Sequence, residues 1–281
     1  MRRTELAGLL QRTESVEVGS YLVASPQLAT GMGTATKRIA GVTCLAAKNV
    51  DEPFLNRALG VGTIAPATAG LLERIERHYA SIGKPSRIAV ATGCVPLASL
   101  RALERRGYAP VEGDGELIYV YDRRTAPAMP QVAGLMIERA GPELASLYSK
   151  TGFESFKDRG PQFVAIVDAL VRSRRRGLRA YLGRIDGEPA ATGMLFDVRP
   201  VGGLGNGSVR PAFRGHGLQT AMIAHRIREG WARGYRIFFG QTVNPVSAHN
   251  MEDLGWRRLY VEHDWERAAP APGGVAAGSK T

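Results

Sequence analysis

The sequence predicts an α/β (α+β) chain that is built from two related domains. Its 281 residues are enough for two domains of about 100–150 residues each. An internal repeat supports the division: helix, short strand, proline-initiated helix, Gly-aromatic pair and strand occur in this order at residues 69–122 and again at 217–267. Residues 95–108 match residues 244–256, the second stretch being one residue shorter. Repetition on this scale indicates a duplicated fold.

Composition places the chain among ordinary globular proteins, with 44% hydrophobic and 22% charged residues. Cys44 and Cys94 are its two cysteines, too few for a disulfide framework and without the spacing of metal ligands, so we expect two buried thiols in a reducing compartment. Polar residues interrupt the apolar stretch after Met1, and no apolar run approaches the ~20 residues of a spanning helix. We therefore expect a cytoplasmic protein with no membrane partner.

The formal net charge of +11 raises the question of nucleic-acid binding. Arg residues are scattered through both halves of the chain, and they do not form a single stripe interleaved with aromatic residues. The densest group, Arg172 and Arg174 to Arg176, follows an apolar helical pattern and precedes Gly177, where cations complement the negative end of a helix dipole. The sequence therefore does not favour a nucleic-acid partner.

The first half of the chain alternates short strands with two clear helices. We expect a short helix at residues 3–12 and strands at 21–24 and 43–48; residues 27–41 leave a loop and a short strand equally open. A helix begins at Ala69 and ends before Gly83, because its apolar residues recur at helical spacing. A strand at 88–91, a helix after Pro96 and a strand at 116–121 complete this half.

The second half begins after a linker at residues 125–131, where two prolines prevent continuation of a strand or helix. We expect strands at 134–139, 179–185, 189–198 and 201–209, helices at 142–149 and 161–176, and a hairpin turn at Asp186-Gly187. Residues 268–281 are rich in Ala, Pro and Gly and are expected to be a disordered tail. The predicted domains are therefore residues 1–124 and 132–267.

Residues 208–220, here called the cradle, combine a strand end, a turn and a helix start. Gly215 and Gly217 precede an apolar helical period, so their backbone can direct N–H groups toward an anion at the positive end of the helix. Phosphate is the anion that such a site suits best. A tight turn without a ligand is the alternative, and dinucleotide binding is disfavoured because Thr220 stands where the third glycine of that motif belongs.

The pattern Val209, Pro211, Arg214, Gly215, Gly217 and Leu218 resembles the acyl-CoA-binding motif of the GNAT acetyltransferases. A second block of that family, an Asn opening a helix that ends in Gly and an aromatic residue, is resembled by residues 244–256. The resemblance implies two GNAT-like domains, each with a mixed, mostly antiparallel central sheet flanked by helices. It also implies acetyl-CoA as co-substrate, contacted by Ser208, Val209, Arg214, Gly215, His216, Gly217, Leu218, Gln219, Thr220, Asn244 and Met251.

The first half lacks the Arg-Gly-x-Gly block, so we interpret it as a degenerate copy that binds no CoA. The second half departs from the family at two positions. Gln219 replaces a small residue, and Met251 stands where a Tyr often protonates the leaving thiolate, which leaves the catalytic acid unassigned. Asn244 is also a good helix N-cap, a role that is compatible with CoA contact.

No carboxylate lies on the two strands that are expected to flank the cleft, where Asn206, Ser208, Gln241 and Thr242 cannot accept a proton well. His249 and Asp197 are the candidate catalytic bases, each acting through water; the alternative is that both are exposed polar residues.

The resemblance predicts an N-acetyltransferase acting on a primary amine of a small-molecule or amino-acid-like acceptor, bound where the two domains meet. The alternative is a non-catalytic CoA-binding sensor or scaffold protein, which Met251 and the unassigned base favour. The sequence leaves the oligomeric state open between monomer and homodimer.

Overall fold

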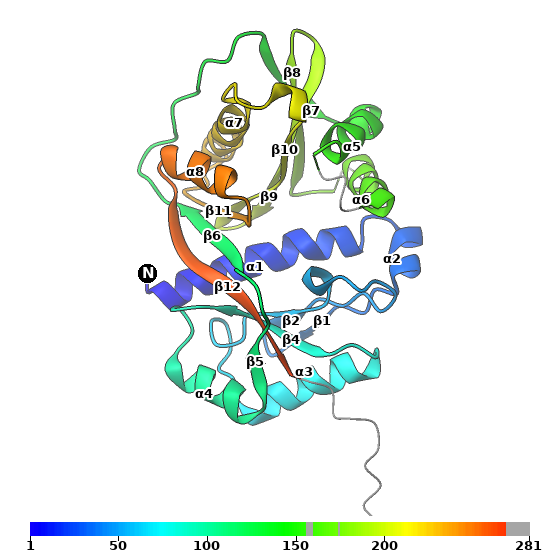
Figure 1. Cartoon of the computed structure of the whole chain (residues 1–281), viewed down its shortest axis with the longest axis vertical. Coiled ribbons are helices and arrows are strands. Elements are labelled where there is room, and N and C mark those ends of the chain that lie inside the picture. The colour runs from blue at the N-terminus through cyan, green and yellow to red at the C-terminus, as the bar shows by residue number, and fades with distance from the viewer. Residues whose placement is uncertain (156–159, 174, 268–281) are drawn as a thin grey trace, which may run out of the picture.

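The computed structural model describes residues 1–155, 160–173 and 175–267. Within these residues twelve strands form one continuous sheet, with β5 attached to β12 beside the main order β1-β2-β3-β4-β12-β6-β11-β10-β9-β8-β7. Two pairs, β3 with β4 and β10 with β11, are parallel, and the other named pairs are antiparallel. This mixed, mostly antiparallel sheet flanked by helices confirms the predicted fold class (Figure 1).

The strands are β1 (Lys37–Ile39), β2 (Val42–Cys44), β3 (Ala58–Leu59), β4 (Ser86–Ala91), β5 (Tyr108–Pro110), β6 (Glu116–Tyr121), β7 (Leu135–Ala140), β8 (Leu178–Ile185), β9 (Glu188–Val198), β10 (Val201–Val209), β11 (Ile237–Thr242) and β12 (Arg257–Arg267). The α-helices are α1 (Arg3–Leu22), α2 (Pro26–Met32), α3 (Ala69–Ser81), α4 (Leu97–Arg105), α5 (Ala145–Phe153), α6 (Gly160–Arg172), α7 (Leu218–Ala232) and α8 (Pro245–Asp253). Short 3₁₀ helices lie at Pro53–Leu55, Pro142–Leu144 and Pro211–Phe213.

Two strands are exchanged between the halves of the chain. Strand β6, from the first half, lies between β11 and β12 of the second. Strand β12 pairs with β6 through its first part and with β4 through residues 262–267, so it completes the sheet of the first half. Figure 1 shows β6 and β12 running together from one half of the molecule to the other. The expected linker at 125–131 therefore follows a strand that already belongs to the sheet of the second half, and the division into residues 1–124 and 132–267 stays a prediction.

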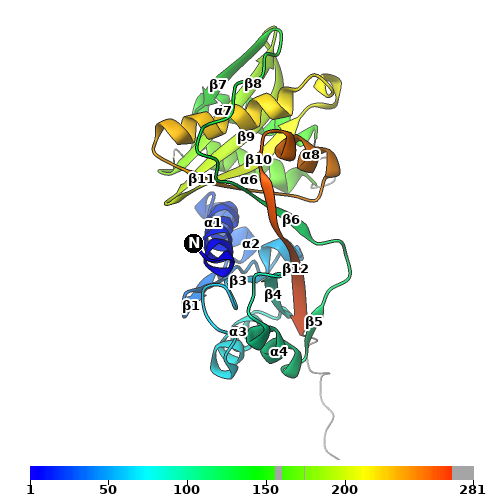
Figure 2. The same ribbon diagram turned by 90° about the vertical axis from the view of Figure 1, so that its left-hand side faces the viewer.

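Helix α1 is where the sequence-based expectation fails most clearly. Instead of a helix at 3–12 and a strand at 21–24, one helix runs from Arg3 to Leu22. It contacts β3 and α2 of the first half and β9, β10 and α6 of the second, and Figures 1 and 2 show it lying across the middle of the molecule. A helix buried on opposite sides has no single apolar stripe, so its sequence lacks the helical period that the prediction required.

The remaining elements follow the predicted order. Helix α3 begins at Ala69 after Thr68, whose side chain accepts a hydrogen bond from the Leu71 amide at 3.3 Å, and it ends before Gly83 with φ +71°. Residues 27–41, which were left open, hold most of α2 and all of β1. The helix expected at 161–176 ends at Arg172, and Arg174 and residues 268–281 lie outside the described residues.

The cysteines Cys44 and Cys94 are both buried and unpaired, as expected. In the described part of the chain, every helix is too short or too polar to cross a membrane.

Candidate active site

The cradle joins the end of β10 to the start of α7. Gly215 and Gly217 have φ angles of +83° and +72°, which L-residues with side chains rarely adopt. Gly217 is the N-cap of α7 and supplies no side-chain cap, and the cradle residues from Arg214 to Gly217 are exposed. The first amides of a 15-residue helix therefore face solvent at its positive end, an arrangement that suits a phosphate group.

Next to the cradle, β10 and β11 separate. Their parallel pairing runs from Val201 with Ile237 to Leu204 with Gly240 and then stops, although both strands continue. On its other side β10 carries a register shift between Gly205 and Ser208 in its pairing with β9. Backbone groups of residues 205–209 and 241–242 therefore line an opening between the two strands.

A cavity of about 580 Å³ follows this opening, and it is called the shared cavity below. From the second half it is lined by Leu204–Val209 on β10, by cradle residues and by Gln241 to Asn244 after β11. Of the residues expected to contact CoA, it brings together Ser208, Val209, Arg214, Gly215, Gly217, Leu218, Gln219, Asn244 and Met251. His216 and Thr220 belong to the cradle but do not line the cavity.

Helix α8 closes one side of this cavity. The Asn244 side-chain oxygen accepts hydrogen bonds from the amides of Val246 at 2.9 Å and Ser247 at 3.3 Å, so Asn244 is a true N-cap. Gln219 on α7 donates to Ser247 Oγ and accepts from Asn250 Nδ2, both at 2.8 Å. The residue that departs from the family pattern thus fastens α7 to α8. Met251, 6% exposed, lines the cavity from the same helix.

The two candidate bases from the sequence lie elsewhere. Asp197 pairs with Gly202 at the far end of β10, six residues from Ser208 and so roughly 20 Å along the strand. Its Oδ2 contacts Arg179 at 2.5 Å and Arg233 at 3.1 Å, which is a structural ion pair. The His249 side chain is 72% exposed and lies 3.3 Å from Asp253 on the outside of α8. Neither residue lines the shared cavity: the His249 side chain is exposed, whereas the Asp197 side chain is 12% exposed and paired with two arginines.

The first half of the chain contributes its own residues to the same cavity. These residues are Glu17 and Tyr21 of α1, Phe54 of the 3₁₀ helix Pro53–Leu55, and Glu116 of β6. The part of the cavity that the first half lines is therefore acidic and aromatic, whereas the part next to the cradle presents helix amides and Arg214.

Glu17 is the buried carboxylate nearest to the opening between β10 and β11. Its side chain lies against Gly203 and Gly205 of β10, and its Oε1 accepts a hydrogen bond from the Tyr21 hydroxyl at 3.2 Å. Burial raises the pKa of Glu17 to about 7, because a carboxylate that has lost its water is less stable than the neutral acid. Glu17 is therefore poised to exchange a proton near neutral pH.

Arg226 of α7 lines the cavity beside Glu17. Burial lowers its pKa to about 10, and its guanidinium donates to the carbonyls of Met222, Met194 and Gly205 at 2.9, 3.1 and 3.2 Å. These bonds hold the backbone of β10 at the point where it leaves β11. Arg226 thus stabilises the opening.

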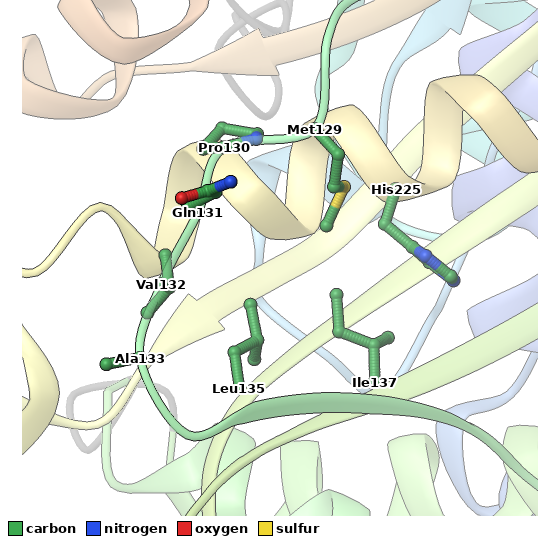
Figure 3. Close-up of a pocket in the computed structure, with 8 residues that line it drawn as sticks. All are labelled: Met129, Pro130, Gln131, Val132, Ala133, Leu135, Ile137 and His225. Carbon is green, nitrogen blue, oxygen red and sulfur yellow. The ribbon is translucent and has the colours of Figure 1, made fainter.

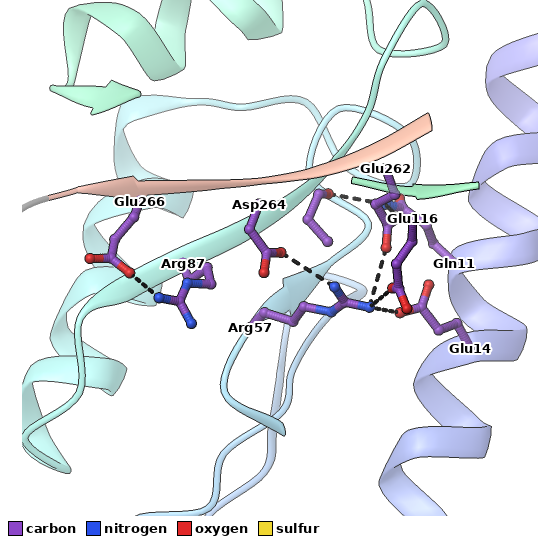
Figure 4. Close-up of polar contacts among 9 residues, drawn as sticks. Gln11, Glu14, Arg57, Arg87, Glu116, Glu262, Asp264 and Glu266 are labelled. Carbon is purple, nitrogen blue, oxygen red and sulfur yellow. Dashed lines mark hydrogen bonds and ion pairs between the residues drawn. The ribbon is translucent and has the colours of Figure 1, made fainter. Parts of the chain in front are cut away.

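Behind Glu116 lies a buried charge cluster, centred on Arg57 and shown in Figure 4. Arg57 Nη2 lies 2.5 Å from Glu14, 2.9 Å from Glu116 and 3.4 Å from Glu262, and Nη1 lies 3.4 Å from Asp264. Burial raises the pKa of Glu14 well above its usual range and that of Glu262 to about 7, with Arg57 opposing the change. The cluster joins α1, β6 and β12, the elements shared by the two halves.

A second cavity, of about 710 Å³, lies between residues 129–133, β7 and α7 (Figure 3). It is lined by residues 129–133 with Leu135, Ile137 and His225. Although it is larger, its lining includes no cradle residue and no carboxylate among the residues that the structure describes. We therefore take the shared cavity as the candidate active site.

Sequence reasoning missed Glu17, Glu116 and Arg226. Glu17 fell outside the predicted helix, and it reaches the site only because α1 extends ten residues further and crosses to the second half. One signal was present in the sequence: the glycines of β10, at 202, 203, 205 and 207, leave room for side chains from other elements.

Comparison with known proteins agrees with this geometry. The family model described as "Acetyltransferase (GNAT) domain" matches residues 100–240. A GCN5-related N-acetyltransferase from Kribbella flavida has a similar structure (TM-score 0.62, 17% identity, 92% of this chain and 97% of that one covered). A tandem GNAT protein from the clavulanic acid biosynthesis pathway is also similar (TM-score 0.57, 16% identity, 96% of this chain and 98% of that one covered).

A conserved protein of unknown function from Bacteroides thetaiotaomicron is also similar (TM-score 0.59, 12% identity, 94% of this chain and 91% of that one covered). At these identities the likenesses show the fold alone. A search of curated proteins finds no matching relative.

Proposed function

Because the chain belongs to the GNAT acetyltransferases, we propose that it transfers an acetyl group from acetyl-CoA to the primary amine of a small-molecule or amino-acid-like acceptor. One observation carries the proposal: a single cavity is lined by the cradle and the opening between β10 and β11 on one side, and by Glu17, Tyr21 and Glu116 on the other. Donor and acceptor can therefore meet in one cavity.

The residues present fit acetyl-CoA as the donor substrate, which supplies the activated acetyl thioester. Amides at the start of α7 and Arg214 would hold the diphosphate. An added side chain at Gly217 would have Val132 as its nearest neighbour at 3.8 Å, so the space in front of these amides is free. Backbone groups of residues 205–209 and 241–242 that face the opening, beyond the last β10–β11 pair, would bind the pantetheine arm and polarise the thioester carbonyl.

The acceptor would enter from the side of the first half. Glu17 and Glu116 supply negative charge there, and Tyr21 and Phe54 supply aromatic surface. This lining suits a protonated amine with an apolar or aromatic body better than a neutral alcohol, because the acidic residues attract the ammonium group. The volume of about 580 Å³ is typical of a small-molecule site, which favours a small acceptor over a folded protein.

The experiment is a screen of an amine library with acetyl-CoA, read by mass spectrometry as gain of one acetyl group. Wild type should acetylate a subset of primary amines, whereas Gly217→Val should not, because its side chain blocks the amides and strains a residue with φ +72°. Gly83→Val is the matched control: Gly83 has φ +71°, open space around it and no contact with the cavity, so it should suffer similar strain and keep activity.

Acetyl-CoA binding without acetylation of any amine would instead support a sensor or scaffold protein. The replacement of the usual Tyr by Met251 is the observation that favours this second candidate.

A further inference from the structure

We propose that Glu17 is the general base of the reaction, so that helix α1 of the first half supplies the proton acceptor that the strands of the second half lack. This inference rests on the proposed function, since it assigns a residue to that same site. It also gives the first half a chemical role.

The geometry places a buried carboxylate with one unused oxygen in the shared cavity. Glu17 is 4% exposed, and Tyr21 donates to its Oε1 at 3.2 Å. Oε2 has no hydrogen-bond partner among the described residues. Burying an acceptor without a donor costs free energy on the order of 1–3 kcal/mol. An ammonium or amine group of a bound acceptor is the donor that this oxygen lacks.

The charged and titratable groups that face Glu17 come from three elements. Tyr21 lies on the same helix, Glu116 on β6 and Arg226 on α7. Glu116 raises and Arg226 lowers the pKa of Glu17, while burial is the largest influence and brings it to about 7. A base with a pKa near the working pH accepts a proton readily and also releases it to solvent after the reaction.

Glu116 is the other carboxylate among the described residues that line the cavity, and it is less suited to this role. Its Oε2 already accepts a hydrogen bond from Arg57 Nη2 at 2.9 Å, whereas Oε2 of Glu17 has no donor among the described residues. Its side chain is 24% exposed, so it lies at a wetter position than Glu17. We therefore assign Glu116 to attraction of the cationic acceptor.

The reaction step balances with the groups named. The Glu17 carboxylate takes one proton from R–NH₃⁺, giving R–NH₂ and the neutral acid. The amine lone pair forms the C–N bond at the thioester carbonyl, the C–S bond breaks, and the second amine proton passes to the departing thiolate directly or through water. The products are the amide, CoA thiol and one proton, which Glu17 returns to solvent. No side chain is required at the position of Met251.

The test is the pH dependence of kcat/KM for wild type, Glu17→Gln and Glu14→Gln, measured with an amine found in the screen. Glu14 is a matched control: it lies one turn earlier on α1, is equally buried and does not line the cavity. Gln has nearly the same shape as Glu and keeps a side-chain oxygen that can accept the hydrogen bond from Arg57 Nη2.

In wild type, kcat/KM should rise with pH through an inflection near 7. Glu17→Gln should lower kcat/KM about 10²–10⁴-fold at pH 7, the usual contribution of a general base, and should remove that inflection. Its Kd for acetyl-CoA should match wild type. Glu14→Gln should keep both the rate and the pH profile.

Wild-type kinetics in Glu17→Gln would overturn the assignment while leaving the proposed function intact. Loss of acetyl-CoA binding in Glu17→Gln would overturn it too, because the residue would then be structural. Failure of wild type to acetylate any amine would remove the proposed function and with it the base. Glu17→Asp is a further test of the base. Its shorter carboxylate should lower kcat/KM but keep the inflection of the pH profile.

Discussion

The carboxylate of Glu17 on α1 occupies the space that a side chain on Gly205 of β10 would need. This contact joins the first half of the chain to the place where β10 and β11 separate. It therefore couples the packing of α1 to the geometry of the candidate active site.

Gly205→Ala should displace the Glu17 carboxylate without changing any ionisable group. We expect kcat to fall about tenfold or more, because a misplaced base loses most of its effect, while Kd for acetyl-CoA stays within about twofold of wild type. Steady-state kinetics and calorimetry provide the measurements. Gly70→Ala on α3, which meets nothing within 4 Å, is the control and should behave as wild type. Unchanged kcat in Gly205→Ala would show that the position of Glu17 does not matter.

Met251 should help select the acyl donor, because it lines the shared cavity from α8. Met251→Ala enlarges the cavity, and we expect the ratio of kcat/KM for butyryl-CoA to that for acetyl-CoA to rise about 10-fold, a change typical of one or two methylene groups in an apolar pocket. Met251→Tyr should lower the same ratio. If both variants keep the wild-type ratio for every donor length, Met251 lies away from the reaction centre.

Ionised Glu17 should destabilise the folded protein at high pH. Its folded pKa of about 7 exceeds the ordinary value of 4.5, so the folded state binds the proton more tightly and loses stability as pH rises from 4.5 to 7. Glu17→Gln should therefore raise the free energy of unfolding by up to about 3 kcal/mol at pH 8 and by about 1 kcal/mol at pH 5. Urea unfolding at the two pH values measures both. Equal effects at both would mean that Glu17 has an ordinary pKa.

Arg57 should be essential for joining α1, β6 and β12. Arg57→Met leaves Glu14, Glu262 and Asp264 buried without their cation, and we expect a loss of roughly 3–5 kcal/mol in the free energy of unfolding at pH 8. The loss should be smaller at pH 5, where more of these carboxylates are protonated. Arg77→Met, which removes an exposed ion pair on α3, is the control and should cost less than about 1 kcal/mol. A small and pH-independent effect of Arg57→Met would contradict a structural role for the cluster.

The sequence predicted the fold class and the donor half of the site because these depend on local signals. A glycine after a helical pattern, such as Gly83, marks a helix end, and an Asp-Gly pair between strands, such as Asp186-Gly187, marks a hairpin. The cradle is contiguous along the chain. Strands β6 and β10 lie at the residues expected for them.

The rest depends on contacts between distant segments. Glu17 enters the site because α1 crosses to the second half, and β6 and β12 exchange places because each pairs with strands far away in sequence. No local pattern of apolar residues in the sequence predicts these pairings. Asp197 was a candidate base because it ends a strand near the site in sequence, yet antiparallel pairing carries it to the opposite end of β10.

The most direct test of the shared site is a crystal structure of the protein with CoA and the amine identified by the screen. The distance to measure is that from Glu17 to the acceptor nitrogen. With the diphosphate on the amides at the start of α7, the amine nitrogen should lie about 2.6–3.2 Å from Glu17 Oε2, within hydrogen-bond reach or one water further. An amine bound away from α1, with Glu17 facing only protein, would contradict both the shared site and the role of Glu17 in it.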